Sequence, residues 1–267
     1  MGYPTNLKAA IRKLSDNIVI VSTAFSRVNI FNFGARMALI NYNNQVIVWS
    51  AIPYGDEVAK GLELLMGQSQ YDVSYLIIPD CEHTMAAQSF KSHHPNIKII
   101  GMDGLSIPNL TVDFQVDKSM ANKALASEQL AKLGVDPVIS DNFEFVYLPY
   151  HRNRELVMFD KKNKILFEAD LLFNLGVKQP LEQYGPATGY PEKFNPHGGL
   201  SYLTRYMHPY SKVGRSLSNS VVNIEKSRPG LQAIYNWDFN QIVMCHGNVI
   251  DTNAKDAFYT NFEKALK

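Results

Sequence analysis

The chain has 267 residues, 46% of them hydrophobic, and its 26 basic and 25 acidic residues leave a formal net charge of +1. This length allows one large core or two small ones, and charges mixed along the chain exclude the clustered basic surface typical of nucleic-acid binding. The two cysteines exclude a disulfide scaffold and favour a reducing compartment, so we expect a cytoplasmic protein.

The first half of the chain alternates predicted strands and helices. Tyr42-Asn43-Asn44 is a turn-prone triplet that predicts a hairpin, and residues 56–66 place apolar side chains on one helical face. The expected strands are 17–22, 36–41, 45–50, 74–78 and 97–101, and the expected helices are 56–66, 84–92 and 118–133.

The second half repeats this order. The expected strands are 143–148, 155–159, 164–167 and 241–244, and the expected helices are 216–237 and 253–267. Two ββα-type halves predict an α/β (α+β) protein with a four-layer αββα sandwich. No sequence repeat or linker divides the chain, so we expect one domain over residues 1–267. The irregular, aromatic-rich span 174–212 is interpreted as an insertion near the functional site.

The N-terminal residues 1–14 lack the apolar region and cleavage site of a secretory signal. No apolar run approaches the roughly 18 residues of a transmembrane helix. We expect a small-molecule substrate and neither nucleic acid nor membrane as a partner, and the sequence leaves the oligomeric state open.

Potential metal ligands follow four of the apolar runs, where strand ends give functional groups a rigid support. Histidine, aspartate and glutamate suit Zn, Mn or Fe, which need roughly four to six converging ligands. Four strand-end positions of one chemical type predict a single assembled metal centre. The candidate ligands are Asp80, Glu82, His83, His151, Asp170 and His246.

These residues also have purely structural interpretations. His83 alone fits a helix N-terminal or core histidine, Asp170 fits a helix N-cap, and Glu82 fits a cap of the helix expected from residue 84. Cys81 and Cys245 adjoin candidate ligands; they are interpreted as small buried hydrophobes, with a soft ligand or redox pair as the alternative.

The order of these motifs resembles the metallo-β-lactamase superfamily. That family has a His-x-His-x-Asp-His loop after a buried strand, then a lone His, an Asp at a strand end and a C-terminal His-Gly. The resemblance spans nearly the whole chain, and an N-terminal stretch also resembles a divergent branch of this superfamily. The matching segments are Ile78–His83, His151, Ile165–Phe173 with Asp170, Cys245-His246-Gly247, and, for the branch, Ser22–Arg27 with Gly34-Ala35-Arg36.

The chain departs from the family's loop, whose first two histidines are Ile78 and Asp80 here and whose Asp is Glu82. Carried over by resemblance, one ion would be held by Glu82, His83, Asp170 and His246, and the other only by Asp80, His151 and Asp170. The resemblance implies one divalent metal, Zn with Mn or Fe as alternatives, or a second ion weakly held. Asp80 would act as general base or weak ligand, and His151 would stabilise an oxyanion or bind metal.

Fold analogy predicts a metal-dependent hydrolase of a small ester, lactone or thioester. Two alternatives stay open. One is a non-catalytic binding or scaffold protein that has lost metal, in which His83, Asp170 and His246 hydrogen-bond one another. The other is an iron-dependent redox protein in which Cys81 and Cys245 take part.

Overall fold

The N-terminal half folds into a seven-stranded sheet with the order β1-β2-β5-β6-β7-β8-β9 in the computed structural model, which describes residues 2–67, 69–176 and 180–267. In this order, the neighbours among β1, β2, β5 and β6 pair antiparallel, and the neighbours among β6, β7, β8 and β9 pair parallel. The strands are β1 (Ala9–Ser15), β2 (Ile18–Thr23), β5 (Ala35–Tyr42), β6 (Gln45–Trp49), β7 (Asp72–Ile77), β8 (Lys98–Met102) and β9 (Phe114–Val116).

A second sheet has five strands in the order β10-β11-β12-β13-β14, antiparallel except for the parallel pair β13 and β14. Its strands are β10 (Ala124–Leu125), β11 (Phe143–Leu148), β12 (Glu155–Asp160), β13 (Ile165–Glu168) and β14 (Gln241–Met244). A separate hairpin consists of β3 (Ser26–Arg27) and β4 (Phe31–Asn32).

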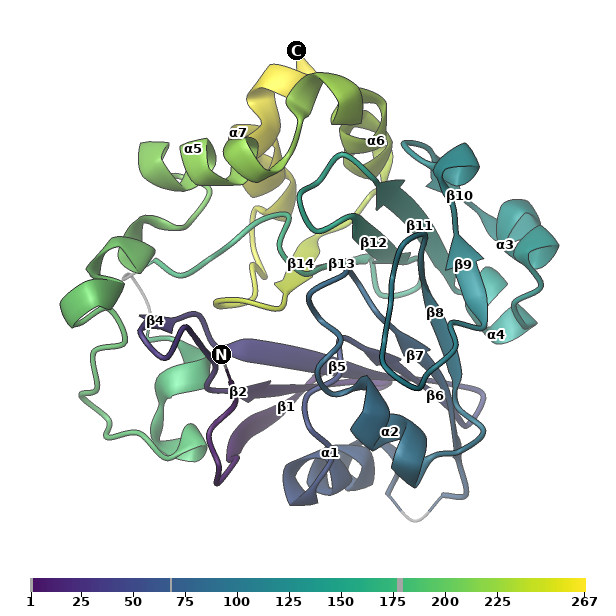
Figure 1. Cartoon of the computed structure of the whole chain (residues 1–267), viewed down its shortest axis with the longest axis horizontal. Helices are drawn as coiled ribbons and strands as arrows, with labels where there is room; N and C mark the ends of the chain where they lie inside the picture. Colours follow the sequence, from purple (N-terminus) through teal and green to yellow (C-terminus); the bar gives the residue numbers. More distant parts are fainter. Residues whose placement is uncertain (1, 68, 177–179) are drawn as a thin grey trace.

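Helices cover the outer faces of both sheets (Figure 1). α1 (Asp56–Met66) and α2 (Ala87–His93) lie on the first sheet, and α6 (Ile224–Asn236) and α7 (Ala254–Leu266) lie on the second, with α5 (Lys212–Val221) beside α7. The predicted four-layer αββα sandwich of the α/β class is therefore confirmed. The remaining helical elements are α3 (Ser127–Leu133), α4 (Pro137–Ser140), η1 (Lys118–Met120), η2 (Glu182–Tyr184), η3 (Pro186–Thr188) and η4 (Gly199–Tyr206).

The second sheet is buried on both faces. Successive side chains of a strand point in opposite directions, so a strand can contribute to the core on either side. In β11, Phe145 and Tyr147 join the core between the sheets, whereas Val146 and Leu148 join the core under α6 and α7. The strand is consequently a continuous apolar run, as expected for a layer covered on both sides.

The predicted hairpin between β5 and β6 is confirmed. Asn43 (φ 53°) and Asn44 (φ 61°) both adopt positive φ, as a two-residue type I′ turn requires. Asparagine tolerates this left-handed conformation better than other residues with a side chain.

Two predicted helices are wrong in extent. The helix expected over 118–133 is interrupted by Asn122, whose φ of 55° and N–H bond to the Tyr147 carbonyl bring the chain onto the edge of β11 as β10. The helix expected over 216–237 is divided into α5 and α6, because Asn223 caps a new helix by accepting the Lys226 N–H.

Within the described ranges, none of the helices combines the length and the apolar character needed to cross a bilayer.

Candidate metal centre

Asp170 and His246 meet because the strands that precede them are parallel neighbours. Glu168 of β13 lies opposite Met244 of β14, and each candidate ligand follows two residues later. Parallel strands that end at one edge of a sheet deliver their following residues to the same place. His246 Nε2 accordingly lies 3.2 Å from Asp170 Oδ1.

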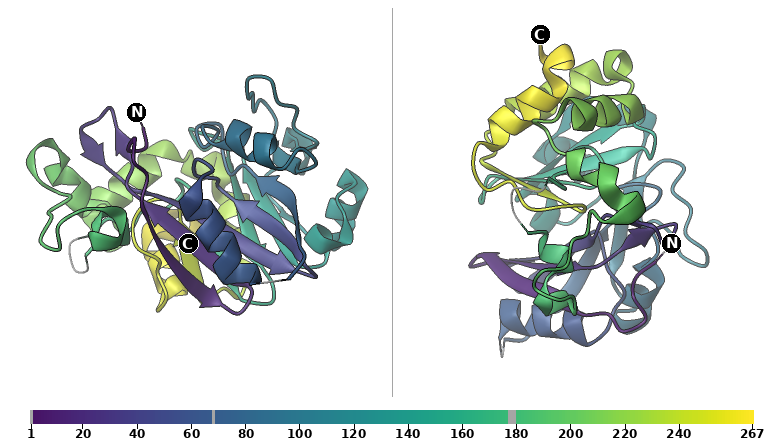
Figure 2. Two further views of the ribbon diagram at one scale, coloured as in Figure 1. Left: turned by 90° about the horizontal axis from the view of Figure 1, so that it is seen from below. Right: turned by 90° about the vertical axis from the view of Figure 1, so that its left-hand side faces the viewer.

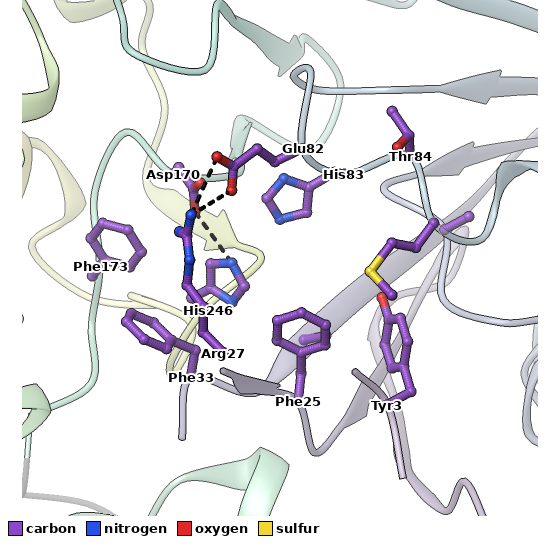
Figure 3. A pocket seen from close by; sticks show the side chains of 13 residues that line it. Tyr3, Phe25, Arg27, Phe33, Glu82, His83, Thr84, Asp170, Phe173 and His246 are labelled. Atoms are coloured by element: carbon purple, nitrogen blue, oxygen red, sulfur yellow. Dashed lines mark hydrogen bonds and ion pairs between the residues drawn. The ribbon is translucent and has the colours of Figure 1, made fainter. Parts of the chain in front are cut away.

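His83 reaches the same place from the other sheet, in the loop that follows β7 (Figure 3). Its ring centroid lies 5.3 Å from that of His246. One ligand atom from each of His83, Asp170 and His246 can be chosen so that all lie within 4.8 Å of one another. Among the described residues, no second group of three or more His, Cys, Asp or Glu side chains converges this closely.

Both imidazoles are held in the tautomer that metal binding requires. His83 Nδ1 lies 2.9 Å from Asp80 Oδ2, and His246 Nδ1 lies 2.6 Å from the Gly34 carbonyl oxygen. A carboxylate and a carbonyl only accept hydrogen bonds, so Nδ1 of each ring donates, and Nε2 is the nitrogen left to face the centre, where binding a metal would require it to be without a proton.

Asp80 lies behind His83 instead of joining the converging group. It is fully buried. Oδ1 accepts the backbone N–H groups of Glu82 and His83 at 2.7 and 2.9 Å, and Oδ2 accepts from the His83 ring. Both carboxylate oxygens therefore already accept hydrogen bonds, one from the loop backbone and one from the His83 ring.

Glu82 is also outside the group, although the resemblance implied that it binds metal. Its side chain is 40% exposed at the rim of the cavity, and Oε2 lies 2.9 Å from Arg27 Nη2. The Glu82 carboxylate thus has Arg27 as its partner and does not point into the group of three converging side chains (Figure 3).

His151 is buried beside the centre without belonging to the converging group. Its Nδ1 accepts the Asn153 N–H at 3.3 Å, and the Asn153 side chain donates to Asp170 Oδ2 at 2.6 Å. Burial lowers the pKa of His151, against the opposing charges of Asp170 and Asp80, so the ring is neutral at neutral pH. His151 Nε2 is a buried atom without a hydrogen-bond partner among the described residues.

Two buried glutamates hold the backbone on which Asp170 stands. Glu155 accepts the N–H groups of Ala169 at 2.6 Å and Asp170 at 3.2 Å, and Glu168 accepts those of the next two residues. Burial raises the pKa of both glutamates. The spacing of candidate ligands in the sequence does not predict this pair; the available signal is the presence of glutamate within otherwise apolar strands.

The electrostatics favour a charged carboxylate between imidazoles. Burial raises the pKa of Asp170, but the hydrogen bond and charge of His246, together with His83 and His151, outweigh burial and hold this pKa below its ordinary value. Burial lowers the pKa of His83, but Asp80 and Cys245 outweigh burial and raise it well above its ordinary value.

The two cysteines have different neighbours and both are free thiols. Cys245 Sγ is buried and lies 3.0 Å from Ser50 Oγ, whereas Cys81 Sγ is half-buried and lies 4.0 Å from the Gly104 carbonyl oxygen. Neither belongs to the converging group.

A cavity of about 290 Å³ opens onto the centre. Its walls are mostly apolar, and the rings of Phe33 and Phe173 lie 5.7 and 5.9 Å from that of His246. Spacing in the sequence did not identify these wall residues. The aromatic and methionine side chains that line the cavity are Tyr3, Phe25, Phe33, Met85 and Phe173.

Solved structures with the same architecture are metallo-β-lactamases. The FIM-1 enzyme from Pseudomonas aeruginosa, in its mono-zinc form, superposes with a TM-score of 0.60 and 9% identity, over 98% of this chain and 96% of that one. The Hirschia baltica enzyme gives 0.58 and 9%, over 97% and 98%. The Erythrobacter litoralis enzyme, with β-mercaptoethanol in its active site, gives 0.59 and 10%, over 99% of each chain.

The chain therefore has the metallo-β-lactamase fold over nearly its whole length, and the low identities fit a divergent sequence. No protein-family model and no curated protein matches the sequence.

Proposed function

We propose that this protein is a metal-dependent hydrolase whose ion is held by His83, Asp170 and His246. The observation that carries the proposal is the convergence of these three side chains to within 4.8 Å from both sheets. A fold shared with metallo-β-lactamases supports the same broad class of chemistry, although a fold alone does not identify a reaction.

The donor set fits a divalent transition metal. Two imidazoles and one carboxylate, with a position left open, form the ligand set of many catalytic zinc sites. The same set also suits non-haem Fe(II). The buried, unpartnered Nε2 of His151 is the kind of polar atom that an additional polar group at the centre would satisfy.

A divalent ion held there would supply a nucleophile from water near neutral pH and would polarise a carbonyl oxygen. The chain's own residues prepare for this chemistry. Asp80 and the Gly34 carbonyl fix the two imidazole rings, and Asn153 fixes the Asp170 carboxylate. In the tautomer set by the Asn153 N–H, His151 carries its proton on Nε2, where it is able to donate to a substrate oxygen.

The cavity supports a compact, uncharged substrate. Its volume of about 290 Å³ is at the small end for ligand pockets. Arg27 is paired with Glu82 and therefore offers little net charge to an anion. A small ester, lactone or thioester with an apolar acyl group matches these walls.

The test begins with elemental analysis of protein purified without added metal, followed by hydrolysis assays on a panel of aryl esters, lactones and thioesters. We expect about one Zn, Mn or Fe per chain, and visible absorption of the purified protein would indicate iron. We expect that His83→Ala, Asp170→Asn and His246→Ala each lose metal and at least about 100-fold in activity.

Glu82→Gln is the matched variant at the rim, and His93→Ala removes an exposed imidazole elsewhere. Both should retain metal, because neither side chain belongs to the converging group. The proposal is wrong if the wild type neither contains nor binds these metals. That result would support the non-catalytic alternative instead.

A further inference from the structure

The β3–β4 hairpin, η4 and α5 carry most of the large apolar side chains that the molecule exposes. Three of the fifteen such side chains in the described ranges come from residues 28–31, and eight more come from residues 194–217. An accumulation of this kind marks an interaction surface, whereas single exposed apolar residues need no explanation. This surface, here called the apolar face, comprises Val28, Ile30, Phe31, Phe194, Leu200, Tyr202, Leu203, Tyr206, Tyr210, Val213 and Leu217.

The apolar face is built on a connected scaffold. Ser201 Oγ donates to the Ile30 carbonyl oxygen at 2.8 Å and accepts the Asn32 N–H at 2.9 Å. The Asn32 side chain donates to the Pro196 carbonyl oxygen at 2.9 Å. These bonds hold η4 against the hairpin, and both lie on the same side of the molecule (Figures 1 and 2).

A surface helix usually packs its large apolar side chains on the core, but α5 turns some of its large apolar side chains outward. It buries Gly214 and Ser218 and exposes Val213 (46%) and Leu217 (43%). The first turn of the helix packs tightly on the segment that leads into it, because a Cβ added at Gly214 would lie 2.4 Å from the His208 carbonyl oxygen. The small side chains therefore serve packing, and the large apolar ones are left for another surface.

η4 shows the same inversion. It buries the polar residues Ser201 and Thr204, and it exposes Leu200 (71%) and Leu203 (66%). Thr204 Oγ1 lies 2.8 Å from Nδ1 of the buried His197, so its inward polar groups are satisfied within the protein. Two consecutive helical elements thus turn their apolar side chains away from the core.

The charge of this region has one sign. Residues 193–224 contain four basic residues and no aspartate or glutamate, in a chain whose net charge is only +1. Within the described ranges, none of the four basic residues forms an ion pair. Carboxylates lie around this segment: Glu192 and Glu225 flank it in sequence, Asp256 accepts from Tyr210, and Glu263 lines the same pocket as Lys212 and Arg215. The four basic residues are Lys193, Arg205, Lys212 and Arg215.

We propose that the apolar face docks on the surface of an anionic lipid bilayer. Exposed leucines, tyrosines and unpaired cations on helical segments are the features of proteins that lie in the membrane interface. Tyrosine, of which the face has three, suits the boundary between lipid and water. A second copy of the chain fits less well, because a symmetric contact would bring two sets of unpaired cations together.

Docking there would bring the cavity close to the bilayer. The same hairpin that exposes Val28 and Ile30 also carries Arg27 and leads into Phe33, both of which line the cavity. From the sequence we expected no membrane partner; the exposed apolar side chains of η4 and α5, which only the fold reveals, support this different proposal. Docking requires no helix that spans the bilayer and does not depend on the proposed hydrolysis.

The test is sedimentation of the full chain with vesicles of phosphatidylcholine alone or with about one third phosphatidylserine. We expect binding to the anionic vesicles that weakens as salt increases. We expect Leu200→Ser combined with Leu203→Ser to weaken binding by at least about tenfold. Lys193→Gln combined with Lys212→Gln should have a similar effect, with stronger loss at low salt.

Matched controls remove similar side chains elsewhere. Leu64→Ser removes an exposed leucine from α1, and Lys132→Gln removes an exposed cation from α3. These variants should bind as the wild type does. Absence of binding to anionic vesicles, or equal losses in the controls, would overturn the proposal. A wild-type dimer that becomes monomeric with the two leucine substitutions would also overturn it and identify the face as a contact between copies. Vesicle binding requires no turnover, so its failure is distinct from failure of the proposed hydrolase.

Discussion

His83 and His246 present the same ring nitrogen to the centre because each commits its other nitrogen to a buried acceptor. For His83 this acceptor is the carboxylate of Asp80, which also accepts two backbone N–H groups. Such carboxylate–histidine pairs orient a ligand and raise its basicity. Asp80 is therefore a positioning residue, and its effect on metal affinity is open to a direct test.

We predict that Asp80→Asn lowers metal affinity by about 10–100-fold. Asparagine can still accept the backbone N–H groups through its oxygen, but its amide nitrogen cannot accept from His83 Nδ1. The ring would then favour the tautomer that protonates Nε2. Competition titration with a chromophoric chelator measures the affinity, and Asp16→Asn at an exposed turn serves as control. Equal affinities for wild type and Asp80→Asn would contradict this role.

The residue scale also shows what the sequence could and could not predict. His83, Asp170 and His246 followed apolar runs and do converge. The position of Glu82 was not predictable from loop spacing, because it depends on Arg27, a residue 55 positions away. Likewise, the role of Asp80 depends on the rotamer that brings its carboxylate to His83.

At the scale of the element, the backbone N–H groups just after β13 are bonded to side-chain carboxylates and not to the carbonyl groups of a neighbouring strand. Glu155 of β12 satisfies the Ala169 and Asp170 N–H groups, and Glu168 satisfies the two that follow. Buried N–H groups without partners are costly. The turn that presents Asp170 consequently depends on Glu155.

Replacement of Glu155 by alanine should lower the free energy of unfolding by roughly 2–5 kcal/mol, since two buried N–H groups would lose their acceptor. Urea unfolding monitored by circular dichroism measures the change. Glu128→Ala removes an exposed glutamate from α3 and should leave the midpoint unchanged. A midpoint for Glu155→Ala equal to that of the wild type would show that water replaces the carboxylate.

The element η2 is tied to both sheets through one buried guanidinium. Arg36 of β5 donates to the Met244 carbonyl of β14 at 2.7 Å and to Glu182 of η2 at 3.0 Å. The Arg36 side chain is 1% exposed. Loss of Glu182 would leave this charge buried without a carboxylate, which typically costs about 3–5 kcal/mol.

This ion pair predicts a pH dependence of stability. Burial raises the pKa of Glu182, but Arg36 and Arg12 outweigh burial and hold it below its ordinary value of 4.5. A carboxyl group with a depressed folded pKa contributes stability that is fully present above the unfolded pKa and is lost as pH falls through the folded pKa.

We therefore expect the difference in unfolding free energy between the wild type and Glu182→Gln to be constant from about pH 7 to about pH 5 and to shrink below 4.5. Other groups titrate in both proteins and cancel in the difference. Urea unfolding across this range provides the measurement, with the exposed Glu192→Gln as control. A difference that grows on acidification would refute the assignment.

Regular elements with clear periodicity, such as α1 and the β5–β6 hairpin, were predictable because local pattern and fold agree. The helix expected over 118–133 failed because edge pairing with β11 overrides its helical pattern. The inverted faces of η4 and α5 were not predictable, since periodicity shows that a helix is amphipathic but not which face meets the core.

At the scale of the whole molecule, the centre joins the two halves of the sandwich. His83 extends from the first sheet, and Asp170 and His246 extend from the second. An ion bound by all three would cross-link the layers and would have no equivalent site in the unfolded chain. Ligands that bind only the folded state stabilise it in proportion to the logarithm of their concentration.

We predict that zinc raises the thermal midpoint of the wild type and that a chelator reverses the change. At a free zinc concentration about 100 times the dissociation constant, the gain is about 2.7 kcal/mol. Because the ion bridges both sheets, far-UV and tryptophan signals should shift together; Trp49 reports on the core between the sheets and Trp237 on the layer under α6 and α7. His83→Ala should abolish the zinc response, whereas His93→Ala should keep it. A response retained in His83→Ala would mean that zinc binds without the first sheet, and the bridge between the layers would then be wrong.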